Sequence, residues 1–315
     1  MTTTVSTPLA DPRKRRNERP NWEEPPTAAG QAGKSTILFL VVAVVVIPIW
    51  MVVLTSLSTQ GAVNNAGGMV LVPQGITFEA YRQIFTNQLI MHALLVSLGI
   101  TVVGTVISMV VTILCAYGLS RHDSYAHRPI LLLLVATMFF SGGLIPTFLV
   151  VTALGGYDSY WSLILPSAVS VFNILVVRSF FSSTAQDLID AAAIDGAGEW
   201  RTLWSVVLPT SRAVTAVVAL FYAVGYWNTF FNALVFLPDN QKWPLQMVIY
   251  TYTLQGNSMP GTGTAGTGQY FGNQQIAPLA IQMAVVTLTL IPILIIYPFV
   301  QRHFTKGVLL GAIKG

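Results

Sequence analysis

Aromatic and amide side chains gather in one apolar stretch of the chain, between residues 213 and 237. They belong to Tyr222, Tyr226, Trp227, Asn228 and Asn232. Aromatic faces, hydroxyls and amides can together replace the water around a polar solute. On a helix, Asn228 and Asn232 lie one turn apart on one face. Two interpretations stay open: a face that binds such a solute, or an interfacial aromatic belt whose asparagines bond to a neighbouring helix.

A second group of residues with directional chemistry lies in the polar stretch 183–210. The three alanines 191–193 favour a helix, and Gly196 suits the left-handed conformation that ends one. We therefore expect a short helix whose alanine face is nearly bare and can lie deep in a groove on another protein. Asp190 and Asp195 would supply charge for basic groups at the rim of that groove.

Neither group of residues makes a catalytic centre, because no Ser/His/Asp or His/carboxylate cluster lies within the apolar stretches. With the single cysteine Cys115, neither a disulfide nor a cysteine-based metal site can form within the chain, and we expect no metal or cofactor. Residues 28–35 and 261–266 fit loose nucleotide-loop patterns but lack the preceding strand that such loops need. The net charge of +4 is scattered along the chain, which argues against a nucleic-acid partner.

The composition indicates a membrane protein, since 53% of the residues are hydrophobic and only 9% are charged. A helix needs roughly 20 apolar residues to cross the hydrocarbon layer. Lipid cannot satisfy backbone polar groups, so long apolar stretches must be helical. The sequence predicts an all-α integral membrane protein with six transmembrane helices, at residues 36–58, 89–119, 129–154, 160–182, 213–237 and 276–300.

The distribution of Lys and Arg predicts the orientation, because positive charge near the ends of spans stays on the cytoplasmic side. With the N-terminus inside, every one of the 16 basic residues except Arg82 and Lys242 falls on that side. We therefore expect both termini in the cytoplasm. The expected parts are a disordered tail over 1–34, a transmembrane domain over 35–302 with a cytoplasmic loop at 183–210, and a cytoplasmic tail over 303–315.

Local patterns within the spans predict how helices pack and bend. Gly104, Ser108, Thr112 and Ala116 recur at every fourth residue, which makes a small-residue stripe along which another helix can approach. Prolines tend to kink helices, because each removes a backbone donor. Those expected within spans stand at positions 48, 146, 166, 278 and 292.

The stretch 183–210 resembles the cytoplasmic motif of one protein family, the permease subunits of binding-protein-dependent ABC importers. That motif reads Glu-Ala-Ala, three residues, Gly, nine residues, then Ile-x-Leu-Pro. This chain has Asp190-Ala191-Ala192, then Gly196, then Val206-Val207-Leu208-Pro209 at the same spacing. The differences from the motif are Asp190 for Glu and Val206 for Ile. Residues 138–146, 226–228 and 311–315 are similar to the carbohydrate branch of the family, in particular to the smaller permease of maltose-type transporters and to its complex-oligosaccharide subgroup.

The resemblance implies a bacterial inner-membrane subunit that forms a translocation path and hydrolyses no ATP itself. It also implies a coupling helix that docks into a cytoplasmic ATPase, with the coupling residues Asp190, Ala191, Ala192, Asp195, Gly196, Leu208 and Pro209. The implied partners are a second, different permease, an ATPase dimer, an extracytoplasmic solute-binding protein and an oligosaccharide substrate. A non-sugar solute is the alternative. A secondary carrier is less consistent with the sequence, because no acidic residue lies inside any span.

Overall fold

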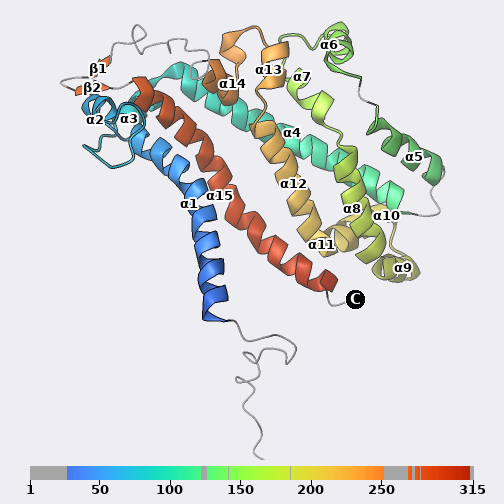
Figure 1. The fold of residues 1–315 in the computed structure, drawn as a ribbon. Coiled ribbons are helices and arrows are strands. Elements are labelled where there is room, and N and C mark those ends of the chain that lie inside the picture. Colours follow the sequence, from blue (N-terminus) through green and yellow to red (C-terminus); the bar gives the residue numbers. More distant parts are fainter. Residues whose placement is uncertain are drawn as a thin grey trace, which may run out of the picture. The chain divides into compact units, whose positions relative to one another are not determined.

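The computed structural model describes residues 27–121, 126–140, 142–184, 186–251, 269–271, 274–276 and 278–312, and most of these residues are helical (Figure 1). In chain order the helices are α1 (Ala28–Ser56), α2 (Gln60–Asn65), α3 (Glu79–Thr86), α4 (Gln88–Ser120), α5 (His127–Thr137), α6 (Leu144–Ala153), α7 (Trp161–Ile164), η2 (Leu165–Ser167), α8 (Val171–Thr184), α9 (Gln186–Ile194), α10 (Glu199–Thr202), η3 (Leu203–Val207), α11 (Leu208–Thr210), α12 (Arg212–Trp227), α13 (Phe231–Phe236), η4 (Asn240–Lys242), α14 (Leu245–Ile249) and α15 (Pro278–Ala312).

Three helices in the described part of the chain are long and apolar enough to cross a membrane, namely α1, α4 and residues Leu279–Pro298 of α15. Two bent pairs raise the number to five if each pair is one span. One pair joins Trp161–Ser167 to Val171–Ser182 at 51°, and the other joins Glu199–Thr210 to Arg212–Trp227 at 85°. Pro166 lies at the first bend, as expected for a residue that cannot donate to the helical ladder. The count of six spans stays a prediction.

The stretch expected as the third span, 129–154, is not one continuous helix. It forms two short apolar helices, α5 and α6, with Gly142 and Gly143 between them. Gly143 has a φ of 78°, a left-handed conformation that glycine adopts without steric cost. Pro146 lies in the first turn of α6, where its missing N–H would have no partner in the helix in any case.

Helix α4 carries the small-residue stripe predicted from the sequence, and α12 and α8 run beside it (Figure 1). The four stripe residues, Gly104, Ser108, Thr112 and Ala116, are all buried. A Cβ added at Gly104 would lie 2.8 Å from the ring of Tyr226 of α12, which is closer than carbon atoms can pack. The stripe therefore lets α12 lie against α4, as the sequence predicted.

A second apolar cluster joins α3, the first part of α4, α14 and α15, and includes Ile84, Ile90, Leu245 and Ile281. A buried hydrogen bond also holds this cluster together. The backbone N–H of Leu245 donates to Ser97 Oγ of α4 at 2.8 Å. Between α14 and α15 the chain also forms an antiparallel pair, β1 (Gln269–Phe271) with β2 (Gln274–Ile276), which the all-α expectation did not include.

The two ends of the chain differ from the expected boundaries. Helix α1 begins at Ala28, so part of the tail expected over 1–34 is helical, and so are Gly33, Lys34 and Ser35 of the loose nucleotide-loop pattern. The tail expected over 303–315 continues α15 as far as Ala312. Residues 1–26, 261–266 and 313–315 lie outside the described residues.

Candidate functional site

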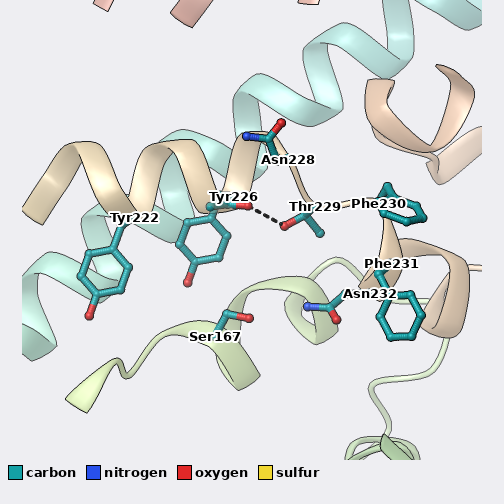
Figure 2. Close-up of a pocket in the computed structure, with 9 residues that line it drawn as sticks. Ser167, Tyr222, Tyr226, Asn228, Thr229, Phe230, Phe231 and Asn232 are labelled. Carbon is teal, nitrogen blue, oxygen red and sulfur yellow. Dashed lines mark hydrogen bonds between the residues drawn. The ribbon is translucent and has the colours of Figure 1, made fainter. Parts of the chain in front are cut away.

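The aromatic and amide residues of the stretch 213–237 line a pocket of about 300 Å³. The lining comprises Ser167, Tyr222, Gly225, Tyr226, Asn228, Thr229, Phe230, Phe231 and Asn232. Figure 2 shows Tyr222 and Tyr226 projecting from one side of α12 toward the segment that holds Ser167. The amide of Asn232 also points toward Ser167. Four of the five residues singled out from the sequence therefore contribute to one pocket.

The two tyrosines are buried and their hydroxyls are held by α4. Tyr226 Oη lies 2.8 Å from Ser108 Oγ and donates to the carbonyl of Ile164 at 3.1 Å. Tyr222 Oη lies 2.7 Å from Thr112 Oγ1 and accepts the backbone N–H of Ser170 at 3.2 Å. Since both hydroxyls are already bonded, the rings offer the pocket mainly their faces and edges.

Trp227 does not share this pocket. Its side chain is buried in the second cluster, and its Nε1–H donates to the backbone carbonyl of Thr289 in α15 at 3.2 Å. One residue along a helix turns the side chain by about 100°, so Trp227 points away from the tyrosine side. Its observed contacts tie α12 to α15.

Asn228 and Asn232 reach the pocket by a different geometry from the expected one, because α12 ends at Trp227 and α13 begins at Phe231. The Asn228 Nδ2 donates to the carbonyl of Val224 at 2.9 Å, and the Thr229 hydroxyl donates to that of Gly225 at 3.2 Å. These side-chain bonds add to the backbone bonds at the end of the helix, where the Val224 carbonyl also accepts the backbone N–H of Asn228 at 3.1 Å. The asparagines therefore flank a helix break and do not share one helical face.

The helix predicted in the 183–210 loop is α9, and it stops at Gly196 as expected. Gly196 has a φ of 77°. The N–H of Ala197 donates to the carbonyl of Ala192 at 2.9 Å, and the N–H of Gly196 donates to that of Ala193 at 3.1 Å. These two bonds make the C-terminal motif that a left-handed glycine allows, so the end of α9 has a defined shape.

One side of α9 is buried and the other is exposed. Ile189 is buried, with Phe181 of α8 and Leu203 of η3, in an apolar cluster to which α4 and α12 also contribute. On the exposed side lie Asp190, Ala191, Ala193, Asp195 and Gly196, and Ala192 is half-buried. Ile194 is 87% exposed at the tip. Ile194 therefore extends the apolar part of this exposed side beyond the alanines.

The second half of the loop adds two exposed aromatic residues. Trp200 is 67% exposed and Trp204 is 65% exposed. The stretch Leu203–Val207 is a π-helix, followed by α11 with Leu208 and Pro209 half-buried. This wider turn lies just before Pro209, which lacks an N–H to donate to the helical ladder.

Glu199, the first residue of α10, joins the loop to the end of α4. Tyr117 Oη donates to Glu199 Oε2 at 2.5 Å, and Arg121 Nη2 donates to Oε1 at 2.5 Å. The hydrogen bond from Tyr117, together with Arg121, lowers the pKa of Glu199 although partial burial opposes the shift. These contacts join residues about 80 positions apart, so no local spacing in the sequence predicts them.

A second ion pair joins Lys242 to the loop after α6. Lys242 Nζ donates to Asp158 Oδ2 at 2.5 Å and to the Asp158 carbonyl at 2.9 Å. The hydrogen bond to Asp158 raises the pKa of Lys242. Lys242 is one of the two basic residues that the expected orientation places outside the cytoplasm. That unusual position is the signal in the sequence that could have indicated its ion pair with Asp158. The pair fixes η4 against the loop that leads into α7.

Comparison with known proteins gives a family match. Residues 109–310 match the family described as the binding-protein-dependent transport system inner membrane component. A polygalacturonan/rhamnogalacturonan transport system permease of Bacillus subtilis (strain 168) is 41% identical over 279 residues, covering 88% of this chain and 96% of that protein. A diacetylchitobiose uptake permease of Streptomyces coelicolor is 27% identical over 283 residues, covering 88% and 87%.

The fold is also similar to a solved structure, a chain of a bacterial ABC transporter involved in import of the acidic polysaccharide alginate. The TM-score is 0.80 at 27% sequence identity, with 95% of this chain and 100% of that chain covered. The matched family segment includes the 183–210 loop and the pocket helix α12. This chain therefore belongs to the family of inner-membrane components of binding-protein-dependent transport systems, the permease subunits of ABC importers, and is a transport subunit rather than an enzyme.

Proposed function

We propose that this permease forms the translocation path for a sugar or oligosaccharide together with a second, different permease. An extracytoplasmic binding protein delivers the solute, and two cytoplasmic ATPase subunits close beneath the permeases. The arrangement requires six spans with both termini in the cytoplasm, so that the 183–210 loop faces the ATPase. The proposed parts are the tail 1–34, the transmembrane domain 35–302 and the tail 303–315.

The observation that carries the coupling half of this proposal is the exposed tip of α9. Asp190, Ala191 and Asp195 lie on a short helix with little side-chain bulk, and Ile194 projects from its end. A helix of this kind fits into a groove on a partner, with its aliphatic residue as an anchor and its carboxylates at the rim. Leu208 and Pro209 connect that helix to α12, so displacement of the loop reaches the pocket helix directly.

The pocket supports the sugar half of the proposal. Tyr222 and Tyr226 present ring surface and Asn232 presents its amide, in a volume near the lower end of the roughly 300 to 1,000 Å³ that is usual for ligand sites. The amide of Asn228, which also lines the pocket, is bonded to Val224 and Gln246. Ring faces and amides are what a sugar needs, because its faces are apolar and its edges carry hydroxyls. Relatives whose names refer to saccharides favour a sugar over a non-sugar solute.

Reconstitution tests the proposal. The permease, its partner permease, the ATPase and the binding protein are placed in liposomes, and ATP hydrolysis and uptake are measured with oligogalacturonides, chitobiose derivatives and a dipeptide as probes. We expect hydrolysis and uptake to rise with a saccharide and not with the dipeptide. Stimulation by the dipeptide alone, or uptake by this chain without ATP, would contradict the proposal.

A further inference from the structure

Both carboxylate oxygens of Glu199 are occupied by side chains from the last turn of α4 and the residue that follows it. Tyr117 bonds Oε2 and Arg121 bonds Oε1, and the two side chains are four residues apart. Tyr117 Oη also lies 3.4 Å from the backbone carbonyl of Glu199. A carboxylate held at both oxygens by a cation and a phenol has a fixed direction, unlike an apolar contact, which can slide.

The same helix α4 supports the pocket further along its length. Thr112 holds the hydroxyl of Tyr222 and Ser108 holds that of Tyr226. Tyr117 therefore lies only about one and a half turns from the residue that positions a pocket tyrosine. A displacement of the end of α4 would reach Tyr222 and Tyr226 through a rigid element and two buried hydrogen bonds.

We propose that Glu199 is the positioning residue that makes the 183–210 loop and α4 move as one body, so that displacement of the loop by the ATPase reaches the pocket through α4. This role rests on the proposed function, because it concerns what happens after α9 has docked. It adds a second route to the direct connection from Leu208 and Pro209 into α12. With both routes intact, α4 and α12 move together and the pocket tyrosines keep their bonds.

The bonds of Glu199 to Tyr117 and Arg121 form a joint between the 183–210 loop and α4. The apolar contacts of the loop do not replace this joint. Ile189, Leu203 and Val207 are buried together with Ala116 and Leu119 of α4, which keeps the loop attached. Hydrophobic contacts of this kind have no preferred direction. The apolar cluster should therefore keep the loop folded in variants that lack the joint, and loss of the joint should affect coupling more than assembly.

The first test measures solute taken up per ATP hydrolysed by the full complex in liposomes, with oligogalacturonides as the probe. Glu199→Ala, Arg121→Ala and the double variant are compared with Glu79→Ala. Glu79 is a matched control, since it also lies in the first turn of a helix and pairs with an arginine, Arg82, at 3.9 Å. We expect uptake per ATP to fall about fivefold in Glu199→Ala, a typical coupling effect, and no further in the double variant.

The charge swap Glu199→Arg with Arg121→Glu should restore part of the coupling, whereas a residue needed only for folding gains nothing from it. Glu199→Gln keeps an acceptor for Tyr117 and should show an intermediate loss. Unchanged uptake per ATP in Glu199→Ala, or additive losses in the double variant, would overturn the joint.

The second test measures movement directly by spin labels at Gly118→Cys of α4 and Ser205→Cys of η3, both exposed positions, in a chain with Cys115→Ser. Trapping the ATP-bound state should leave the distance between the labels unchanged in the otherwise native chain and shift or broaden it in Glu199→Ala. An unchanged distance in Glu199→Ala would overturn the joint alone. Absence of saccharide-stimulated hydrolysis in the unmodified complex would overturn the proposed function and the joint with it.

Discussion

Gly104 of α4 lies directly against the ring of Tyr226 of α12, and a Cβ at Gly104 would approach three ring carbons to within 2.8 to 2.9 Å. The hydroxyl of the same tyrosine bonds Ser108, one turn further along α4. The pair explains how a bulky aromatic residue can be buried at a close helix crossing. It also makes the position of Tyr226 sensitive to the size of a residue that is not part of the pocket.

Gly104→Val should destabilise the permease by about 1–3 kcal/mol, because the added side chain must displace the Tyr226 ring from a well-packed contact. Gly99→Val is the matched control on the same helix, since a Cβ at Gly99 meets no atom within 4 Å. Thermal unfolding of the purified complex measures both. Equal unfolding temperatures for the two variants would show that Tyr226 does not pack against Gly104.

Gly196→Val should disrupt the end of α9, because a β-branched residue is strained at a φ of 77° by roughly 1–2 kcal/mol. The expected result is weaker capture of the ATPase by the permease and lower transport. Gly198→Val is the control, since Gly198 has a φ of −71° that any residue adopts. Capture of the ATPase in equal amounts by both variants would mean that the shape of this helix end is unimportant for assembly.

Substituting Asn228 and Asn232 together by alanine should reduce uptake of the saccharide at normal expression, by about tenfold if each amide contributes one ordinary hydrogen bond. Asn240→Ala, at an exposed position of η4 away from the pocket lining, is the control. Uptake equal to that of the control would remove both amides from the solute path.

The contribution of the Glu199 joint to the stability of the folded state should fall as the pH is lowered. The pKa of Glu199 is lowered below the usual 4.5, so the folded state favours the carboxylate. The stabilisation is therefore complete above the ordinary pKa and is lost as the pH falls through the lowered value. The unfolding temperature of Glu199→Gln should lie slightly below that of the unmodified chain from pH 8 to about pH 5, and the difference should vanish in stronger acid. The difference in unfolding free energy between the two proteins should be about 1 kcal/mol or less, because the pair of Glu199 and Arg121 is largely exposed. A difference that grows on acidification would contradict this assignment.

Local sequence patterns predicted those features of the fold that depend on local geometry. The stripe from Gly104 to Ala116 follows from the repeat of the helix, and the stop at Gly196 follows from the conformational freedom of glycine. The proline at 166 lies at a bend, whereas Pro48 and Pro292 lie inside continuous helices. A proline therefore indicates where a helix can bend, and packing decides whether it does.

Other features depend on contacts that no spacing reveals. The break after Trp227 is stabilised by the side chains of Asn228 and Thr229, which bond carbonyls of the preceding turn. Composition alone could not distinguish the pocket tyrosines from Trp227, which packs in the second cluster and bonds α15, because all three are aromatic and close in sequence. The joint at Glu199 needs α10 and the end of α4 to be adjacent, which only the tertiary structure provides.

The most direct test of the account concerns which side of the membrane α9 faces and whether the ATPase covers it. Ile194→Cys in a chain with Cys115→Ser places one reactive thiol at the exposed tip of α9. A membrane-impermeant maleimide should label it in inside-out vesicles only, and bound ATPase should slow the labelling. Labelling in right-side-out vesicles, or an equal rate with and without the ATPase, would contradict the account.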